Sequence, residues 1–296
     1  MKKLIGIAIF FFLISLCERG MAQTVVERDS TYIFEMKDGN AYIGKVAFFE
    51  ENKVYQVETS VGLLTLRQED IKSIKKITFS DLKGGEYWLP SPHSTRYFFS
   101  PSGYGLRKGE AYYQNAWIFF NQVSYGFSDY FTAGVGMIPT FLFGVTDFLP
   151  VWVTPKFNVP YKNGRGAFGA GSLILGIIGE SDEVVGIVYG SNTFGVRDKQ
   201  FTLGLGWGYS TEGGFSNSPT INASGLIRTG KNWAFLTENY LFTAQDFTAG
   251  IISGGARYMG KRFAIDFGGI LPITDELDGF YIIPWLSISV PFGKKY

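Results

Sequence analysis

The chain has 296 residues, and its 27 Lys and Arg side chains nearly balance 26 Asp and Glu, for a formal net charge of +1. This balance excludes the concentrated basic surface that binds nucleic acid. One His and one Cys exclude a His/Cys metal site, a Cys-His pair and a disulfide framework. Charged residues make up only 18% of the chain, whereas aromatic residues reach 17% and glycines number 38, a profile typical of an envelope β protein.

The N-terminus reads as a secretory signal peptide over residues 1–22. Lys2 and Lys3 precede a 13-residue apolar stretch, Leu4–Leu16, which is too short to cross a bilayer as a helix. Ala22 marks the expected cleavage site. An alternative reading of Cys17 is a lipoprotein anchor, but Leu16 stands where that signal needs a small residue. A secreted chain without another apolar span is periplasmic, released or an outer-membrane barrel.

Residues 30–78 predict a small β domain. Short alternating segments separated by turn residues favour five strands and one helical turn. The expected strands are Thr31–Met36, Tyr42–Phe49, Val54–Thr59, Leu63–Arg67 and Ile71–Ile77, with the helical turn at 68–70.

This pattern resembles the SH3-like and Sm-like barrels. The marks are Asp38-Gly39, Gly44, the Thr59 and Gly62 turn, and the isoleucines that end the last strand. The resemblance implies a fold but no activity, because a secreted domain meets no RNA of the Sm type. A domain this small is marginally stable alone, so we expect residues 30–78 to bind a neighbouring domain or an envelope protein partner.

Residues 79–93 predict a linker, since Gly84-Gly85, Pro90 and Pro92 forbid a long regular element. Residues 94–296 then alternate with period two. In Gln200–Ser210 one face is large and apolar while the other is small and polar. The segments are longer than soluble strands and match membrane-crossing strands of about 9–11 residues. Twelve strands are expected: Arg96–Ser100, 113–125, 129–139, 150–159, 165–178, 184–195, 199–211, 218–229, 231–243, 246–258, 261–271 and 280–292.

The region from residue 94 to the end resembles the broad class of small, porin-like outer-membrane β-barrels of the gram-negative envelope. The predicted fold is therefore all-β: an antiparallel transmembrane barrel of about 12 strands behind a small SH3-like periplasmic domain. Alternate connections are short, as periplasmic turns are, and the others are longer. With 12 strands, the N-terminal domain and both termini are expected in the periplasm.

Charged residues inside the predicted strands are the candidate functional residues. Glu238 and Asp266 lie mid-strand and should face the lumen, because a carboxylate facing lipid is costly. One hypothesis is a constriction that favours cations. The alternative is a packed ionic network with Arg228, Arg257, Tyr240 or Lys156.

No catalytic, cofactor or metal residue is predicted. Gly225–Asn232 and Gly255–Arg262 approach the phosphate-binding loop but lack the Ser or Thr after Lys and open no helix, which argues against nucleotide binding. His93 is the single possible imidazole base. It precedes the first expected strand and is placed in a loop near the inner rim, far from an outer active site.

These features favour a non-enzymatic outer-membrane barrel in contact with outer-membrane lipid. It would act as a narrow pore, a transport conduit or a structural envelope protein with a periplasmic interaction module. One alternative is a barrel-embedded enzyme acting on lipid or glycan. Another is a soluble, secreted β-rich binding protein, which would have to bury every apolar face assigned here to lipid.

Overall fold

The computed structural model describes residues 30–38, 40–50, 53–77, 82–83, 86–88, 91–145, 147–179, 183–244, 247–260, 262–274, 279 and 281–293. The predicted signal peptide, residues 1–22, lies outside the described residues. The chain divides into two compact units, Met1–Trp88 and Leu89–Tyr296. Within the described residues, no helix is long and apolar enough to cross a membrane.

The first unit contains a five-stranded antiparallel sheet with the order β4-β3-β2-β1-β5. A core of Tyr32, Phe34, Tyr55 and Val57 lies against it because these side chains alternate with polar ones along each strand. All five strands and the helical turn fall where the sequence predicts them. Their bounds are β1 (Thr31–Met36), β2 (Ala41–Glu50), β3 (Val54–Thr59), β4 (Gly62–Arg67), η1 (Gln68–Asp70) and β5 (Ile71–Ile77), followed by the short pair β6 (Leu82–Lys83) and β7 (Glu86–Tyr87).

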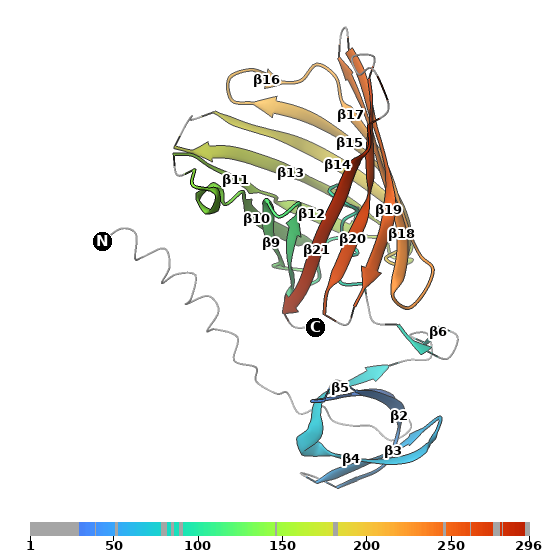
Figure 1. The fold of residues 1–296 in the computed structure, drawn as a ribbon. Helices are drawn as coiled ribbons and strands as arrows, with labels where there is room; N and C mark the ends of the chain where they lie inside the picture. The colour runs from blue at the N-terminus through green and yellow to red at the C-terminus, as the bar shows by residue number, and fades with distance from the viewer. Residues whose placement is uncertain are drawn as a thin grey trace. The chain divides into compact units, whose positions relative to one another are not determined.

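The second unit is a closed antiparallel barrel (Figure 1). The ring closes where β21 pairs with β8, from Ser287 opposite Ala116 to Gly293 opposite Glu110. Its strands are β8 (Glu110–Ala116), β9 (Phe120–Gly126), β10 (Phe131–Met137), β11 (Leu149–Val153), β12 (Lys156–Pro160), β13 (Gly166–Ile178), β14 (Val184–Val196), β15 (Lys199–Ser210), β17 (Thr220–Arg228), β18 (Trp233–Ala244), β19 (Phe247–Met259), β20 (Ala264–Ile273) and β21 (Ile283–Gly293). Two further elements, η3 (Thr140–Phe143) and β16 (Gly214–Phe215), lie between strands.

The barrel has 12 strands, because β11 and β12 are the two halves of one interrupted strand. Both halves pair with β13. The interruption falls at Thr154-Pro155, where proline has no backbone N–H to donate.

Two of the strand assignments predicted from the sequence are wrong, and they cancel in the count. Arg96–Ser100 forms no strand; only one isolated bridge joins Arg96 to Pro101 in this segment. The predicted strand 113–125 is instead the hairpin β8–β9. Trp117 and Ile118 in its turn have φ values of 50° and 70°, which residues other than glycine rarely adopt.

The barrel is apolar outside and polar inside. Along β15, Phe201 and Leu203 on the outer face are 46% and 47% exposed, whereas Thr202 between them is fully buried. Along β21, Leu286 is 57% exposed and Ser287 is 2% exposed. This inverts the arrangement of a soluble barrel and suits a lipid surround.

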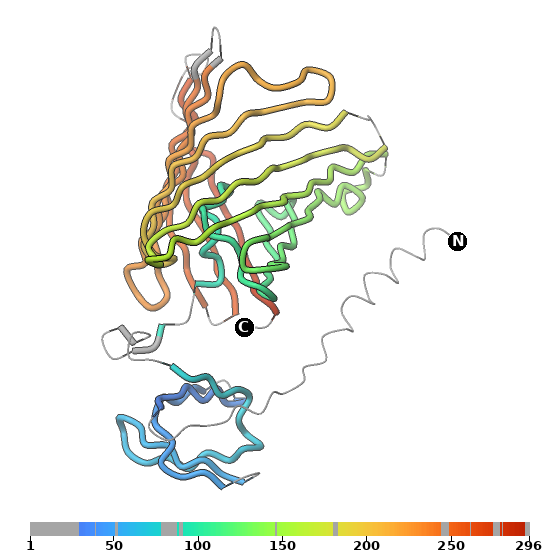
Figure 2. The backbone as a smooth tube through the Cα atoms, turned by 180° about the vertical axis from the view of Figure 1, so that it is seen from behind, coloured from blue at the N-terminus to red at the C-terminus, as the bar shows by residue number. Residues whose placement is uncertain are grey.

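The wall of the barrel is uneven in height (Figure 2). Strands β8, β9 and β10 have seven residues each, whereas β13, β14 and β19 have 13 each. The barrel therefore has one low side, at the β8–β9 hairpin.

Candidate functional site: a segment inside the barrel

Residues 91–106 lie inside the lower half of the barrel; we call this segment the plug (Figure 2). Tyr97 and Phe98 are 0% and 1% exposed, and they pack with Trp285 and other side chains of the barrel wall. Pro92, Pro101, Gly103 and Gly105 interrupt any regular element here. The plug backbone must therefore find its hydrogen-bond partners on the barrel wall.

Glu238 on β18 binds the plug backbone. Its Oε2 accepts hydrogen bonds from the backbone N–H groups of Phe99 and Ser100, each at 2.9 Å. Its Oε1 accepts a third from the Tyr240 hydroxyl at 2.8 Å. Glu238 is 4% exposed. The carboxylate is thus saturated by donors and does not face an open lumen.

Asp266 on β20 forms a buried, bidentate ion pair with Arg257 on β19. The two bonds run from Arg257 Nε to Oδ1 at 2.6 Å and from Nη2 to Oδ2 at 2.8 Å. The same guanidinium donates to the backbone carbonyls of Tyr97, at 2.9 Å, and of His93. Asp266 therefore orients the arginine that holds the plug, a bidentate geometry that lysine could not reproduce.

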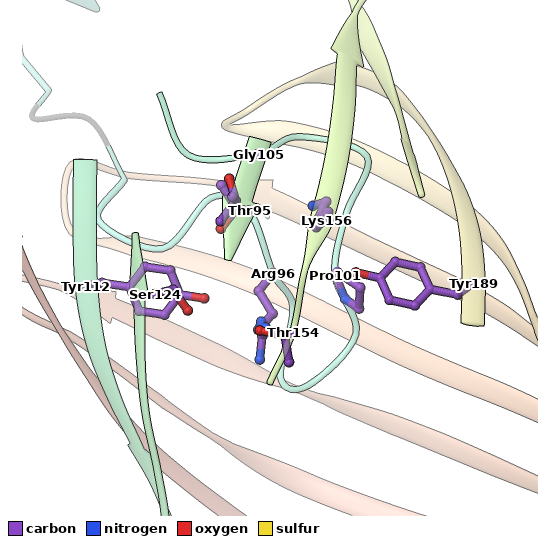
Figure 3. A pocket seen from close by; sticks show the side chains of 10 residues that line it. Thr95, Arg96, Pro101, Gly105, Tyr112, Ser124, Thr154, Lys156 and Tyr189 are labelled. Atoms are coloured by element: carbon purple, nitrogen blue, oxygen red, sulfur yellow. The ribbon is translucent and has the colours of Figure 1, made fainter. Parts of the chain in front are cut away.

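Lys156 on β12 supplies a third charged contact. Its ammonium donates to the carbonyls of Tyr104, at 2.6 Å, and Ser102. Figure 3 shows Lys156 and Arg96 beside a cavity of about 20 Å³, lined also by Tyr112 and Tyr189. This volume holds roughly one water molecule. The gap at this position therefore admits no solute larger than water.

Arg228 on β17 does not join these contacts. It pairs with Asp198 at 3.4 Å and donates to the carbonyls of Gly230, at 3.2 Å, and Lys231. All three partners belong to turns at the end of the barrel where β21 finishes. Of the three charged residues predicted from the sequence to face the lumen, Glu238 and Asp266 take part in the plug contacts, whereas Arg228 binds turn residues.

His93 lies within the plug rather than in a loop at the rim, which corrects the sequence-based placement. It is 1% exposed, and its ring meets Tyr112 edge-on at 4.8 Å. Among the described residues, neither ring nitrogen has a hydrogen-bond partner. Burial lowers the pKa of the His93 imidazole well below its ordinary value, and the Arg257 and Arg96 guanidinium groups lower that pKa further.

The closed pairing and the apolar exterior decide the class of protein. The chain forms a closed antiparallel β-barrel of the kind that spans membranes. No family model matches the sequence, and no curated protein matches it. No group of three potential metal ligands occurs among the described residues.

Several solved porins share the general architecture at low similarity. The KdgM porin in complex with disordered oligogalacturonate has 9% identity and a TM-score of 0.41, over 62% of this chain and 95% of that one. A second KdgM porin structure has 10% identity and a TM-score of 0.40, over 62% and 96%. Pseudomonas aeruginosa OprD has 12% identity and a TM-score of 0.36, over 92% and 97%. The closed barrel is established by this chain's own strand pairing.

Proposed function

We propose that the protein is a non-enzymatic outer-membrane conduit whose inner half is closed by its own residues 91–106. The observation that carries this proposal is the set of contacts made by Glu238, Arg257 and Lys156. The charged group of each side chain forms hydrogen bonds with backbone groups of the plug. A permanently closed small barrel would fill its lumen with side chains of its own strands.

One side of the wall around the plug supports this reading because its inward positions are small or polar. A Cβ added at Gly169 would lie 3.1 Å from the Gly103 backbone, and one at Gly134 would lie 2.5 Å from the Thr154 hydroxyl. Thr193 and Thr202 line the same face and are fully buried. On the other side, Leu226, Leu236 and Trp285 pack against the plug, so its withdrawal would leave a lumen with one polar side that water fills.

We expect residues 30–78 to form a periplasmic module with an SH3-like fold. Such a module suits binding by an envelope protein partner. The chain runs from this module into the plug through residues 79–90. Both termini would then lie in the periplasm, because the strand number is even. Tension or binding at the module would act directly on the plug.

Two alternatives are less well supported. A barrel-embedded enzyme would need an accessible base, and His93 is buried among aromatic and arginine side chains. A structural envelope protein would keep the plug permanently in place, and the test below distinguishes it from a conduit.

Single-channel recording in planar bilayers tests the proposal. We expect the purified protein to be closed with rare openings, and Lys156→Met to open more often because two plug carbonyls lose their cationic donor. Lys199→Met, at an exposed lysine on the β15 end, is the matched control. Absence of openings in every variant would favour the structural role, and a large conductance unaffected by Lys156→Met would contradict closure by the plug.

A further inference from the structure

The interior of the barrel changes character above the plug. In β13 and β14, Leu173 pairs with Ile187 and Leu175 with Val185. Ile187 lies six residues from Thr193, whose hydroxyl accepts a hydrogen bond from plug residue Gly103. Because a strand alternates faces with period two, Ile187 and its partner Leu173 also point inward. On β13 and β14, the inner face is small or polar beside the plug and aliphatic beyond it.

The opposite side of the barrel repeats this change. Phe242 lies four residues beyond Glu238 on β18 and shares its inward face. Tyr240 pairs with Ile251 of β19, which pairs in turn with Pro272 of β20. A polar pore would carry hydrogen-bonding groups along its whole length. Here the outer half of the lumen presents mainly hydrocarbon and aromatic rings, with the Thr220 and Ser210 hydroxyls among them.

This apolar inner surface is accessible. Leu173, Ile187, Phe242 and Ile251 are each only partly buried, in contrast to the fully buried residues around the plug. Phe99, at the tip of the plug, is 49% exposed. Beyond Glu238, no charged residue occupies the inner face of the described strands. The inner face of the outer lumen is therefore partly accessible and uncharged.

The low side of the barrel ends within the membrane. Seven residues, at ~3.4 Å per residue and a tilt of ~40°, rise about 18 Å. The apolar band of such barrels is about 25 Å tall. The β8–β9 turn therefore lies at the depth of acyl chains. Strands of 13 residues rise about 33 Å by the same estimate and cross the whole band.

The residues at this low edge join the outer and inner apolar surfaces. Ile118 is 73% exposed at the turn. Trp117 contacts both Phe120, at 6.0 Å between ring centroids, and Trp285, at 4.7 Å, while Phe120 contacts Trp152 at 6.1 Å. The Trp117 indole N–H donates to the Pro284 carbonyl at 2.6 Å, so no free donor of this ring faces the edge. Asn115 and Asn121 beside the turn bind each other and the carbonyls of Ile118 and Phe119, so the polar groups of this edge are largely paired within it and the remaining surface is apolar.

We propose that the outer lumen binds an acyl chain of a membrane lipid, which enters from the outer leaflet over the low β8–β9 edge. This inference rests on the proposed outer-membrane conduit and specifies the class of ligand. An acyl chain needs no hydrogen-bond partner and gains free energy in proportion to the apolar surface it buries. Its polar headgroup would remain at the rim. A sugar or an ion would find no charge on these walls and few donors, such as the Thr220 and Ser210 hydroxyls.

Photo-crosslinking with a diazirine-labelled phosphatidylcholine, in vesicles holding the full-length protein, tests the proposal. Outward residues such as Leu203 and Leu205 contact lipid in any barrel and serve as an internal reference. We expect additional labelling of the inward residues Leu175, Ile187 and Phe242. Labelling confined to the outward residues would overturn the proposal.

A matched pair of variants sharpens the test. A Cβ at Gly208, on the inner face of β15, has no neighbour closer than 3.9 Å, and one at Gly254, on the outer face of β19, has none within 4 Å. Gly208→Trp should reduce the ratio of inner to outer labelling at least about fivefold, because the indole occupies the lumen. Gly254→Trp should leave the ratio unchanged. Equal ratios in both variants would contradict the inference.

Folding of each variant is checked by heat-modifiable gel migration. The outcomes separate the two proposals. Inner labelling in a barrel that never conducts would refute the conduit and leave the acyl site standing. Conductance that responds to Lys156→Met without inner labelling would refute the acyl site alone.

Discussion

Replacement of Glu238 by Ala should release the plug. The carboxylate accepts two backbone N–H groups of the plug, at 2.9 Å each. A hydrogen bond to a charged group contributes about 1.5–3 kcal/mol, and water entering the vacated space recovers part of it. A net loss of about 2–4 kcal/mol in plug docking corresponds to a roughly 30- to 900-fold rise in the undocked fraction.

Hydrogen exchange of the Phe99 and Ser100 amides measures this fraction directly. In detergent micelles, we expect Glu238→Ala to accelerate their exchange by that factor and Glu238→Gln, which keeps one acceptor oxygen, by less. Glu212→Ala is the control, because Glu212 is exposed near the β15–β16 turn and has no plug contact. Exchange rates equal to those of Glu212→Ala would refute the role of Glu238 as a plug anchor.

Three further predictions concern Asp266, His93 and the core of the small unit. Asp266→Asn leaves Arg257 buried without its counter-ion, which should lower the stability of plug and barrel by about 3–5 kcal/mol. The measurement is the temperature at which heat-modifiable migration is lost, and a shift no larger than that of Glu212→Ala would argue against this. Burial lowers the pKa of His93 in the folded state, so the contribution of His93 to plug docking is constant above its ordinary pKa of about 6.5 and is lost as the pH falls below that value. Channel openings should therefore increase between pH 7 and 5. An equally large increase in His93→Gln would contradict this. Phe34→Ala should destabilise the small unit by about 3–5 kcal/mol through a core cavity while the barrel keeps its gel migration, and thermal unfolding of the two units separates these effects.

Most strands of both units were predictable from the sequence because they follow period-two alternation. Along β15, the large apolar residues and the small polar ones separate cleanly, so strand bounds and face assignments agree with the structure. The five strands of the small unit follow for the same reason.

The β8–β9 hairpin was missed because its turn violates the usual turn chemistry. Trp117 and Ile118 adopt positive φ at positions where Gly, Asn or Asp is the recognisable signal. The apolar run 116–120 spans the turn itself, so the segment resembles a single long strand.

The plug was missed because its fold depends on tertiary contacts. Residues 91–106 carry two prolines, two glycines and no regular period, and their backbone is satisfied by side chains up to 164 positions away. One signal was present: Arg96–Ser100 was by far the shortest predicted strand, and Pro101 and Gly103 follow it at once. Sequence reasoning also missed the apolar outer lumen, although the run Leu173–Ile178 is apolar on both faces rather than alternating.

A disulfide lock tests closure by the plug most directly. Ser100 Oγ on the plug lies 3.1 Å from Asn222 Oδ1 on β17, so cysteines at both positions can be cross-linked, and the expected cleavage at Ala22 removes the native Cys17. The account predicts that single-channel openings vanish when Ser100→Cys with Asn222→Cys is oxidised and return on reduction. Openings of unchanged size and frequency in the oxidised protein would show that the conduction path does not require the plug to move.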